Sequence, residues 1–188
     1  MSDAYTTYWS RSMVEALRAL GQESARLCVL FGGPHTSLPS FRRAGVRVGD
    51  LVYPVHVAQG ALYVLGSLRV TATMSLQTYI SANPELFGGL EGGWPMATLE
   101  NYLACHPQLA WLAPTCVDEV VLGAGTPIRL DVQVDPAVVS QLRYRSRRGE
   151  RPLKHVTDGR ITHVIGLQGI YRLAPQSAAA FARIADVL

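Results

Sequence analysis

The densest run of side chains that could do chemistry lies between Leu142 and Val156, and that chemistry is cationic. The run reads LRYRSRRGERPLKHV and holds six of the seventeen Lys and Arg residues with one acid, Glu150. Residues 143–155 therefore carry a net charge of +5, while the other 175 residues sum to −2, from eleven cations and thirteen acids. Positive charge concentrated on one segment attracts and holds anions such as phosphates.

A two-stranded hairpin is the structure that this run predicts. If residues 142–148 form a strand, Arg143, Arg145 and Arg147 share one face, because side chains alternate along a strand. A turn at Arg148-Gly149 would then place the remaining cations on the return strand. The candidate nucleic-acid-binding residues are Arg143, Tyr144, Arg145, Arg147, Arg148, Arg151, Lys154 and His155.

Two interpretations of this hairpin stay open. It could track phosphates, with Tyr144 either stacking on a base or bracing the hairpin. Alternatively, it is a solvated edge whose arginines prevent aggregation between strands. The sequence around it has no acidic run that would neutralise six cations, and this favours binding.

Signals for catalysis and for metal binding are weaker. Cys116, Asp118 and Glu119 with one of the five histidines could form a nucleophile site, because a thiolate needs a base to activate it. No histidine pair has H-x-x-x-H or H-E-x-x-H spacing, so no metal site is expected. The stretches GGLEGGW and GAGTP lack the residues of a phosphate loop, and no cofactor is expected.

Composition predicts a single globular domain. The chain has 188 residues, 48% of them hydrophobic, which is enough for one well-filled core. No run reaches the ~18 apolar residues of a membrane span, and the first residues lack a signal-peptide pattern, so a cytoplasmic location is expected. Three scattered cysteines argue against a disulfide framework.

The elements that must position the cationic run can be read from local signals. Ser12 and Glu15 form a capping box for a helix within residues 1–24, an N-terminal helical extension. Residues 26–31 read as a strand. Residues 51–57 and 62–70 form a hairpin around Gln59-Gly60, with Pro54 expected at an edge or a bulge.

The second half of the chain continues the same pattern. Residues 74–114 are expected to be an irregular insertion, followed by two strands around the turn at 123–127. An Asp158-Gly159 turn precedes a late strand, and residues 174–188 form a closing helix with Pro175 in its first turn. The predicted fold is α+β: a small curled sheet or barrel over residues 25–173, with an N-terminal and a C-terminal flanking helix.

One hairpin resembles a known superfamily. The series Gly49-Asp50-Leu51-Val52-Tyr53, followed by Gly60, Leu62, Tyr63, Val64, Gly66 and Val70, is similar to the GD-x-V…G…G-x-V hairpin of the PUA-like superfamily, which includes EVE, ASCH and YTH domains. The resemblance implies a small β-barrel that binds RNA or DNA and holds one base in a pocket beside the first strand. By position, it implies that the pocket walls are Phe31, His35, Thr36, Ser37, Tyr53 and Trp94.

The predicted function is therefore that of a nucleic-acid-binding module. The cationic hairpin would supply salt-dependent affinity, and the pocket would read a single base, because phosphate contacts alone give no sequence choice. Two alternatives stay open: a small hydrolase that acts on an amide or a modified nucleoside in the same pocket, and a module that binds an acidic protein partner. RNA or DNA and the oligomeric state are left undecided.

Overall fold

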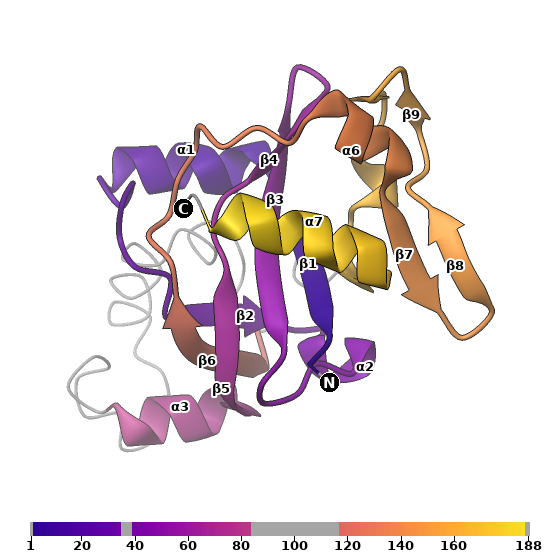
Figure 1. Ribbon diagram of the computed structural model, residues 1–188. Coiled ribbons are helices and arrows are strands. Elements are labelled where there is room, and N and C mark those ends of the chain that lie inside the picture. The colour runs from indigo at the N-terminus through magenta and orange to yellow at the C-terminus, as the bar shows by residue number, and fades with distance from the viewer. Residues whose placement is uncertain (1, 35–38, 84–116, 187–188) are drawn as a thin grey trace.

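The computed structural model describes residues 2–34, 39–83 and 117–186, and its centre is one seven-stranded sheet (Figure 1). Its strands are β1 (Ala4–Tyr8), β2 (Val29–Gly32), β3 (Leu51–Ala58), β4 (Ala61–Val64), β5 (Leu68–Ser75), β6 (Glu119–Gly125) and β11 (Ile170–Arg172). The order is β11-β1-β3-β5-β6-β2, with β4 paired to β3. Every pairing is antiparallel except that of β1 with β3. The predicted α+β class is confirmed, but the curled sheet stays open and is not a closed barrel.

Helices cover the sheet and divide the core into three hydrophobic clusters. The helices are α1 (Arg11–Ala19), α2 (Phe41–Ala44), α3 (Leu76–Ala82), α6 (Pro136–Gln141) and α7 (Pro175–Ala185). Helix α2 contacts both β11 and β6, which lie far apart in the sheet order, and its Phe41 is buried between them. The predicted closing helix is confirmed as α7, with Pro175 in its first turn and Phe181 buried against Tyr53. No helix in the described ranges is long and apolar enough to cross a membrane.

Two small hairpins extend beyond the main sheet. One joins β7 (Arg143–Ser146) to β8 (Gly149–Pro152), and the other joins β9 (Val156–Thr157) to β10 (Arg160–Ile161). The predicted Asp158-Gly159 turn is present in the second hairpin, with φ values of 49° and 73°. The short 3₁₀ helix η2 (Val164–Gly166) follows it, so the predicted late strand shrinks to the three residues of β11.

The predicted N-terminal helix is present as α1, but the segment before it is not helical. It begins with β1, which lies inside the sheet between β11 and β3. Both faces of β1 are covered, and Thr6 and Thr7 are buried with their neighbours, so the strand shows no alternation of apolar and polar residues. Helix α1 starts one residue before Ser12, because the side chain of Ser10 accepts the hydrogen bond from the Met13 amide.

The predicted hairpin after Asp50 is more complex in the structure. Its second run splits into β4 and β5, and β3 changes its antiparallel partner from β5 to β4 between Val52 and Val55. Pro54 lies at this change of partner in an interior strand, where its carbonyl accepts from the Leu65 amide and no proline N–H is needed. The expectation of an edge position is wrong for this reason. The second strand predicted after residue 127 is also absent, because only isolated bridges form there.

The Gly49-Asp50 pair of the resemblance motif has a structural role. Gly49 has a φ of 92°, a backbone conformation that favours glycine. The buried carboxylate of Asp50 accepts hydrogen bonds from the backbone amides of Asp3 (2.8 Å) and Arg47 (2.9 Å). The motif therefore ties the start of β1 to the loop before β3.

Candidate nucleic-acid interface

The cationic run forms a hairpin that projects from the body of the protein, and we call residues 143–152 the basic arm (Figure 1). Its turn is Arg147-Arg148, one residue earlier than predicted. The hydroxyl of Ser146 closes this turn, donating to the carbonyl of Gly149 (2.8 Å) and accepting from the Arg148 amide (3.3 Å). Gly149, with a φ of 110°, takes the conformation that lets the strand return.

The root of the basic arm is fixed to the core. The Arg143 amide donates to the hydroxyl of Ser177 on α7 (2.9 Å), and the Arg143 carbonyl accepts from the Ala174 amide (3.0 Å). Tyr144 is only 2% exposed, and its hydroxyl accepts a hydrogen bond from Thr6 on β1 (3.2 Å). Burial raises the pKa of Tyr144 above its ordinary value. Of the two roles considered for Tyr144, the structure shows bracing.

Cations lie on both faces of the basic arm and at its tip. Directly opposite residues of antiparallel strands point to the same face. Arg145 pairs with Glu150, so these two share one face, while Arg151 pairs with Tyr144 and lies on the other. The alternation predicted for Arg143 and Arg145 is present, but Arg147 belongs to the turn. The strand β8 ends at Pro152, before Lys154 and His155, so these two are not on the return strand as predicted.

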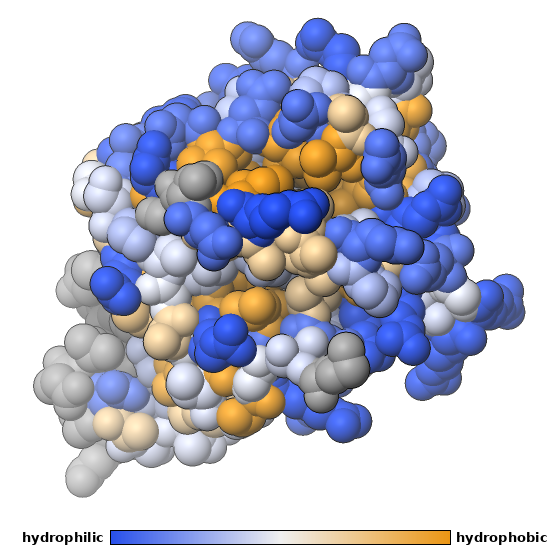
Figure 2. Space-filling view, viewed as in Figure 1, coloured by the Kyte–Doolittle hydropathy of each residue, from blue (hydrophilic) through white to orange (hydrophobic). Residues whose placement is uncertain are grey.

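The charges of the basic arm are not neutralised by neighbouring carboxylates. Five ion pairs occur in the part of the chain that the structure describes, and none includes Arg143, Arg145, Arg147, Arg148, Arg151 or Lys154. All six side chains are exposed. Figure 2 shows strongly hydrophilic side chains over the right-hand side of the molecule, where Figure 1 places β7 and β8. The arm therefore presents unpaired positive charge to solvent.

A hollow of about 240 Å³ opens beside the basic arm, and we call it the arm hollow. It is formed where the chain leaves β8 and where η2 and β11 pass next to it. Its lining residues are Tyr144, Arg151, Pro152, Leu153, Lys154, His155, Ile165, Gly166 and Tyr171. Among these lining residues none is acidic. Four of the predicted nucleic-acid-binding residues therefore meet at one concave site: Tyr144, Arg151, Lys154 and His155.

Two of the six residues expected to line the pocket implied by the resemblance are buried in the core. Phe31 is 2% exposed and packs edge-on against Tyr79 of α3, with ring centroids 6.1 Å apart. Tyr53 is 1% exposed and packs against Phe181 of α7, at 5.4 Å, in a different cluster. Both rings are therefore used as core. The other expected walls, His35, Thr36, Ser37 and Trp94, lie outside the described residues.

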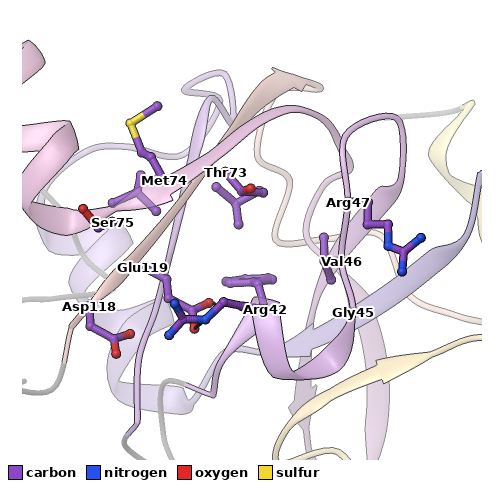
Figure 3. Close-up of a pocket in the computed structure, with 12 residues that line it drawn as sticks. Arg42, Gly45, Val46, Arg47, Thr73, Met74, Ser75, Asp118 and Glu119 are labelled. Carbon is purple, nitrogen blue, oxygen red and sulfur yellow. Dashed lines mark hydrogen bonds and ion pairs between the residues drawn. The ribbon is translucent and has the colours of Figure 1, made fainter.

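A larger cavity of about 440 Å³ lies between α2 and the strands β5 and β6 (Figure 3). Its lining includes Asp118 and Glu119, both considered for catalysis, together with Arg42, Arg47 and Thr73. No sequence pattern predicted this cavity, because the helix α2 spans only four residues and is too short to show a hydrophobic period.

The buried carboxylate of Glu119 is engaged in holding α2. It accepts hydrogen bonds from the hydroxyl of Ser40 and from the Arg42 amide (3.0 Å), and the Arg42 guanidinium lies 3.9 Å from it. In Figure 3 the Arg42 side chain lies beside this carboxylate, and Asp118 points away from both. Cys116, the nucleophile considered with it, lies outside the described residues. Within the described ranges no cluster of three or more His, Cys, Asp or Glu side chains could hold a metal ion.

Comparisons with known proteins give similarity in structure only. No family model matches the sequence, and no curated protein matches it. Among solved structures, the chain is similar to an ASCH protein from Zymomonas mobilis, at 11% identity and a TM-score of 0.40, over 96% of this chain and 94% of that one. It is also similar to a hypothetical protein from Leishmania major, at 11% identity and a TM-score of 0.41, over 100% and 96% of the two chains.

Proposed function

We propose that this protein is a nucleic-acid-binding module whose basic arm contacts the phosphate backbone. The observation that carries this proposal is the set of six exposed cations within residues 143–154, against one acid and without a carboxylate partner among the described residues. Five of the six are arginines, whose planar guanidinium groups bind phosphate oxygens in pairs.

The geometry of the basic arm supports the same function. The hydrogen bonds at its root fix the direction of the hairpin, so little conformational freedom is lost when a ligand binds. Cations on both faces and at the tip match a phosphate backbone that passes around the hairpin. The same arrangement suits insertion of the basic arm into the major groove of DNA, because that groove is about 12 Å wide and admits a two-stranded ribbon.

Charge reversal tests the proposal. The variant Arg145→Glu, Arg147→Glu, Arg148→Glu changes three arm cations that line neither cavity. The matched control Arg11→Glu, Arg18→Glu, Arg183→Glu makes the same change in net charge on α1 and α7. Fluorescence anisotropy with labelled 20-nucleotide RNA and DNA, single-stranded and duplex, at low salt should show a loss of more than about 100-fold for the arm variant and less than about threefold for the control.

Two results would overturn the proposal. Equal losses in the two variants would show that net charge alone determines binding, and no binding of any oligonucleotide by the unchanged protein would remove the function. In the second case, a labelled poly-glutamate peptide tests one of the two alternatives. Binding of that peptide in a manner that depends on the arm would favour a module for an acidic protein partner.

A further inference from the structure

We propose that the arm hollow binds one unpaired nucleotide, with its base against the apolar and aromatic wall and its phosphate at Arg151 and Lys154. This inference rests on the proposed function, because it names the part of the nucleic acid that this site would take. The reasons are the chemistry of the wall, its rigidity, its size and its position beside the basic arm.

The wall combines rings and aliphatic groups that water does not solvate well. Ile165 is 53% exposed, and it is one of three exposed large hydrophobic residues in the part of the chain described. It lines the arm hollow together with Leu153, His155 and Tyr171. Removing an exposed apolar side chain from water is favourable, and the planar face of a base can cover this side chain and stack on the rings beside it.

The His155 side of the wall is held in place before any ligand binds. His155 has a left-handed backbone, with a φ of 59°, and its carbonyl accepts from both the amide (2.8 Å) and the hydroxyl (3.0 Å) of Thr162. Its ring lies 5.6 Å from that of His163, whose Nδ1 accepts from the Ile165 amide (3.1 Å). A site whose walls are already ordered loses less entropy on binding.

Gly166 allows the two sides of the arm hollow to approach each other. A Cβ at this position would lie 3.2 Å from the Lys154 carbonyl oxygen and 3.3 Å from the Leu153 side chain. The helix η2 therefore comes close to the chain that leaves the basic arm. This approach brings Ile165 next to residues of the cationic run.

The arm hollow already contains a stack of a cation on a ring. The guanidinium of Arg151 lies 5.2 Å over the ring of Tyr171, and that ring packs against Tyr144 at 5.3 Å. The Tyr171 hydroxyl donates to the Gln168 carbonyl (2.9 Å), which fixes the ring further. Guanidinium planes and aromatic rings are both surfaces on which bases stack, and Arg151 can at the same time contact a phosphate.

Size and charge restrict what can enter. The volume of about 240 Å³ is below the ~300–1,000 Å³ of sites for drug-sized ligands, so it suits one ring system rather than a longer ligand. The absence of acidic residues among its lining residues leaves no repulsion for the attached phosphate. A base that is paired and stacked in a duplex cannot reach a hollow of this kind, so the site favours a single strand.

Base removal and wall removal together test the inference. The probes are a labelled 10-nucleotide single strand and a fully abasic strand of the same length and charge, and the readout is the ratio of their dissociation constants by anisotropy. The unchanged protein should bind the strand with bases about tenfold more tightly, in line with the stacking of one base. The variant Ile165→Ala, His155→Asn should bring this ratio close to one; asparagine is chosen because it accepts the left-handed backbone.

A matched control and the salt dependence separate this inference from the proposed function. Leu20→Ala removes another exposed aliphatic side chain, 40% exposed and far along the sequence, and should leave the ratio unchanged. A ratio near one in the unchanged protein would overturn the inference, and so would a ratio that the wall variant does not alter. If both strands still bind through the basic arm, the proposed function stays intact. Failure of the unchanged protein to bind either strand would instead refute the proposed function.

Discussion

The salt dependence of binding gives the sharpest prediction for the basic arm. Each phosphate that a cation neutralises releases condensed counterions, so the logarithm of the binding constant falls linearly with the logarithm of the salt concentration. If all six exposed cations of residues 143–154 contact phosphates, the slope should be about −4 for a single strand and about −5 for a duplex. A fourfold rise in salt, from about 50 to about 200 mM, should then weaken binding by roughly 300-fold to 2,000-fold.

Removing two charges changes this slope by a known amount. The variant Arg145→Gln, Arg147→Gln keeps long polar side chains and removes two arm cations, so the slope should become shallower by about 1.4 for a single strand or about 1.8 for a duplex. The control Arg11→Gln, Arg18→Gln removes two exposed cations of α1 that already have the acidic partners Glu15 and Glu23. Its slope should stay within about 0.3 of the unchanged protein, since these groups contact no phosphate.

The assay is anisotropy at five or more salt concentrations with a single buffer and probe. The result that would refute the reasoning is a slope that the two arm substitutions leave unchanged, even if the affinity falls. That outcome would mean that Arg145 and Arg147 act through folding or through contacts other than phosphate. Equal changes of slope in the arm variant and the control would also refute it.

Two further predictions concern stability. Asp50→Ala leaves the amides of Asp3 and Arg47 without their buried acceptor and should lower the free energy of unfolding by about 2–4 kcal/mol in urea titrations. Asp131→Ala, at an exposed ion pair, should lower it much less, and equal losses in the two variants would contradict the anchoring role of Asp50. Burial raises the pKa of Tyr5, Tyr8, Tyr53 and Tyr144, so the unfolded chain loses these protons first and stability should fall as the pH rises above about 10. Tyr144→Phe should make this fall less steep, and an equally steep fall in that variant would show that Tyr144 does not take part.

Local sequence signals were enough to predict the elements whose conformation is set by neighbouring residues. The basic arm, the Asp158-Gly159 turn and the α7 helix with Pro175 follow from charge, from turn residues and from a fixed φ, all of which act within a few residues. The turn of the arm was displaced by one residue. Such a shift changes which residues pair across a hairpin, and the face on which Arg151 lies follows from that pairing.

The features that were not predictable depend on contacts distant in sequence. The strand β1 is covered on both faces, so its threonines are buried and hide the usual alternation. The helix α2 is too short for a periodic signal, and the larger cavity depends on it. The arm hollow forms where the residues after β8 meet η2 and β11, and nothing in either segment alone indicates that they meet. Tyr53 and Phe31 were predicted to line a pocket, but contacts with α7 and α3 bury both rings in the core.

The place of β1 in the sheet has a consequence for synthesis of the chain. Tyr5 pairs with Arg172, so β1 needs a neighbour that lies far along the chain and is made much later. Contacts of such large sequence separation slow folding, because the loop between the partners must close before the pairing contributes. On the ribosome, the nascent chain would therefore carry one side of β1 open until β11 has emerged. Chaperone dependence and loss of yield in truncations before residue 170 should follow.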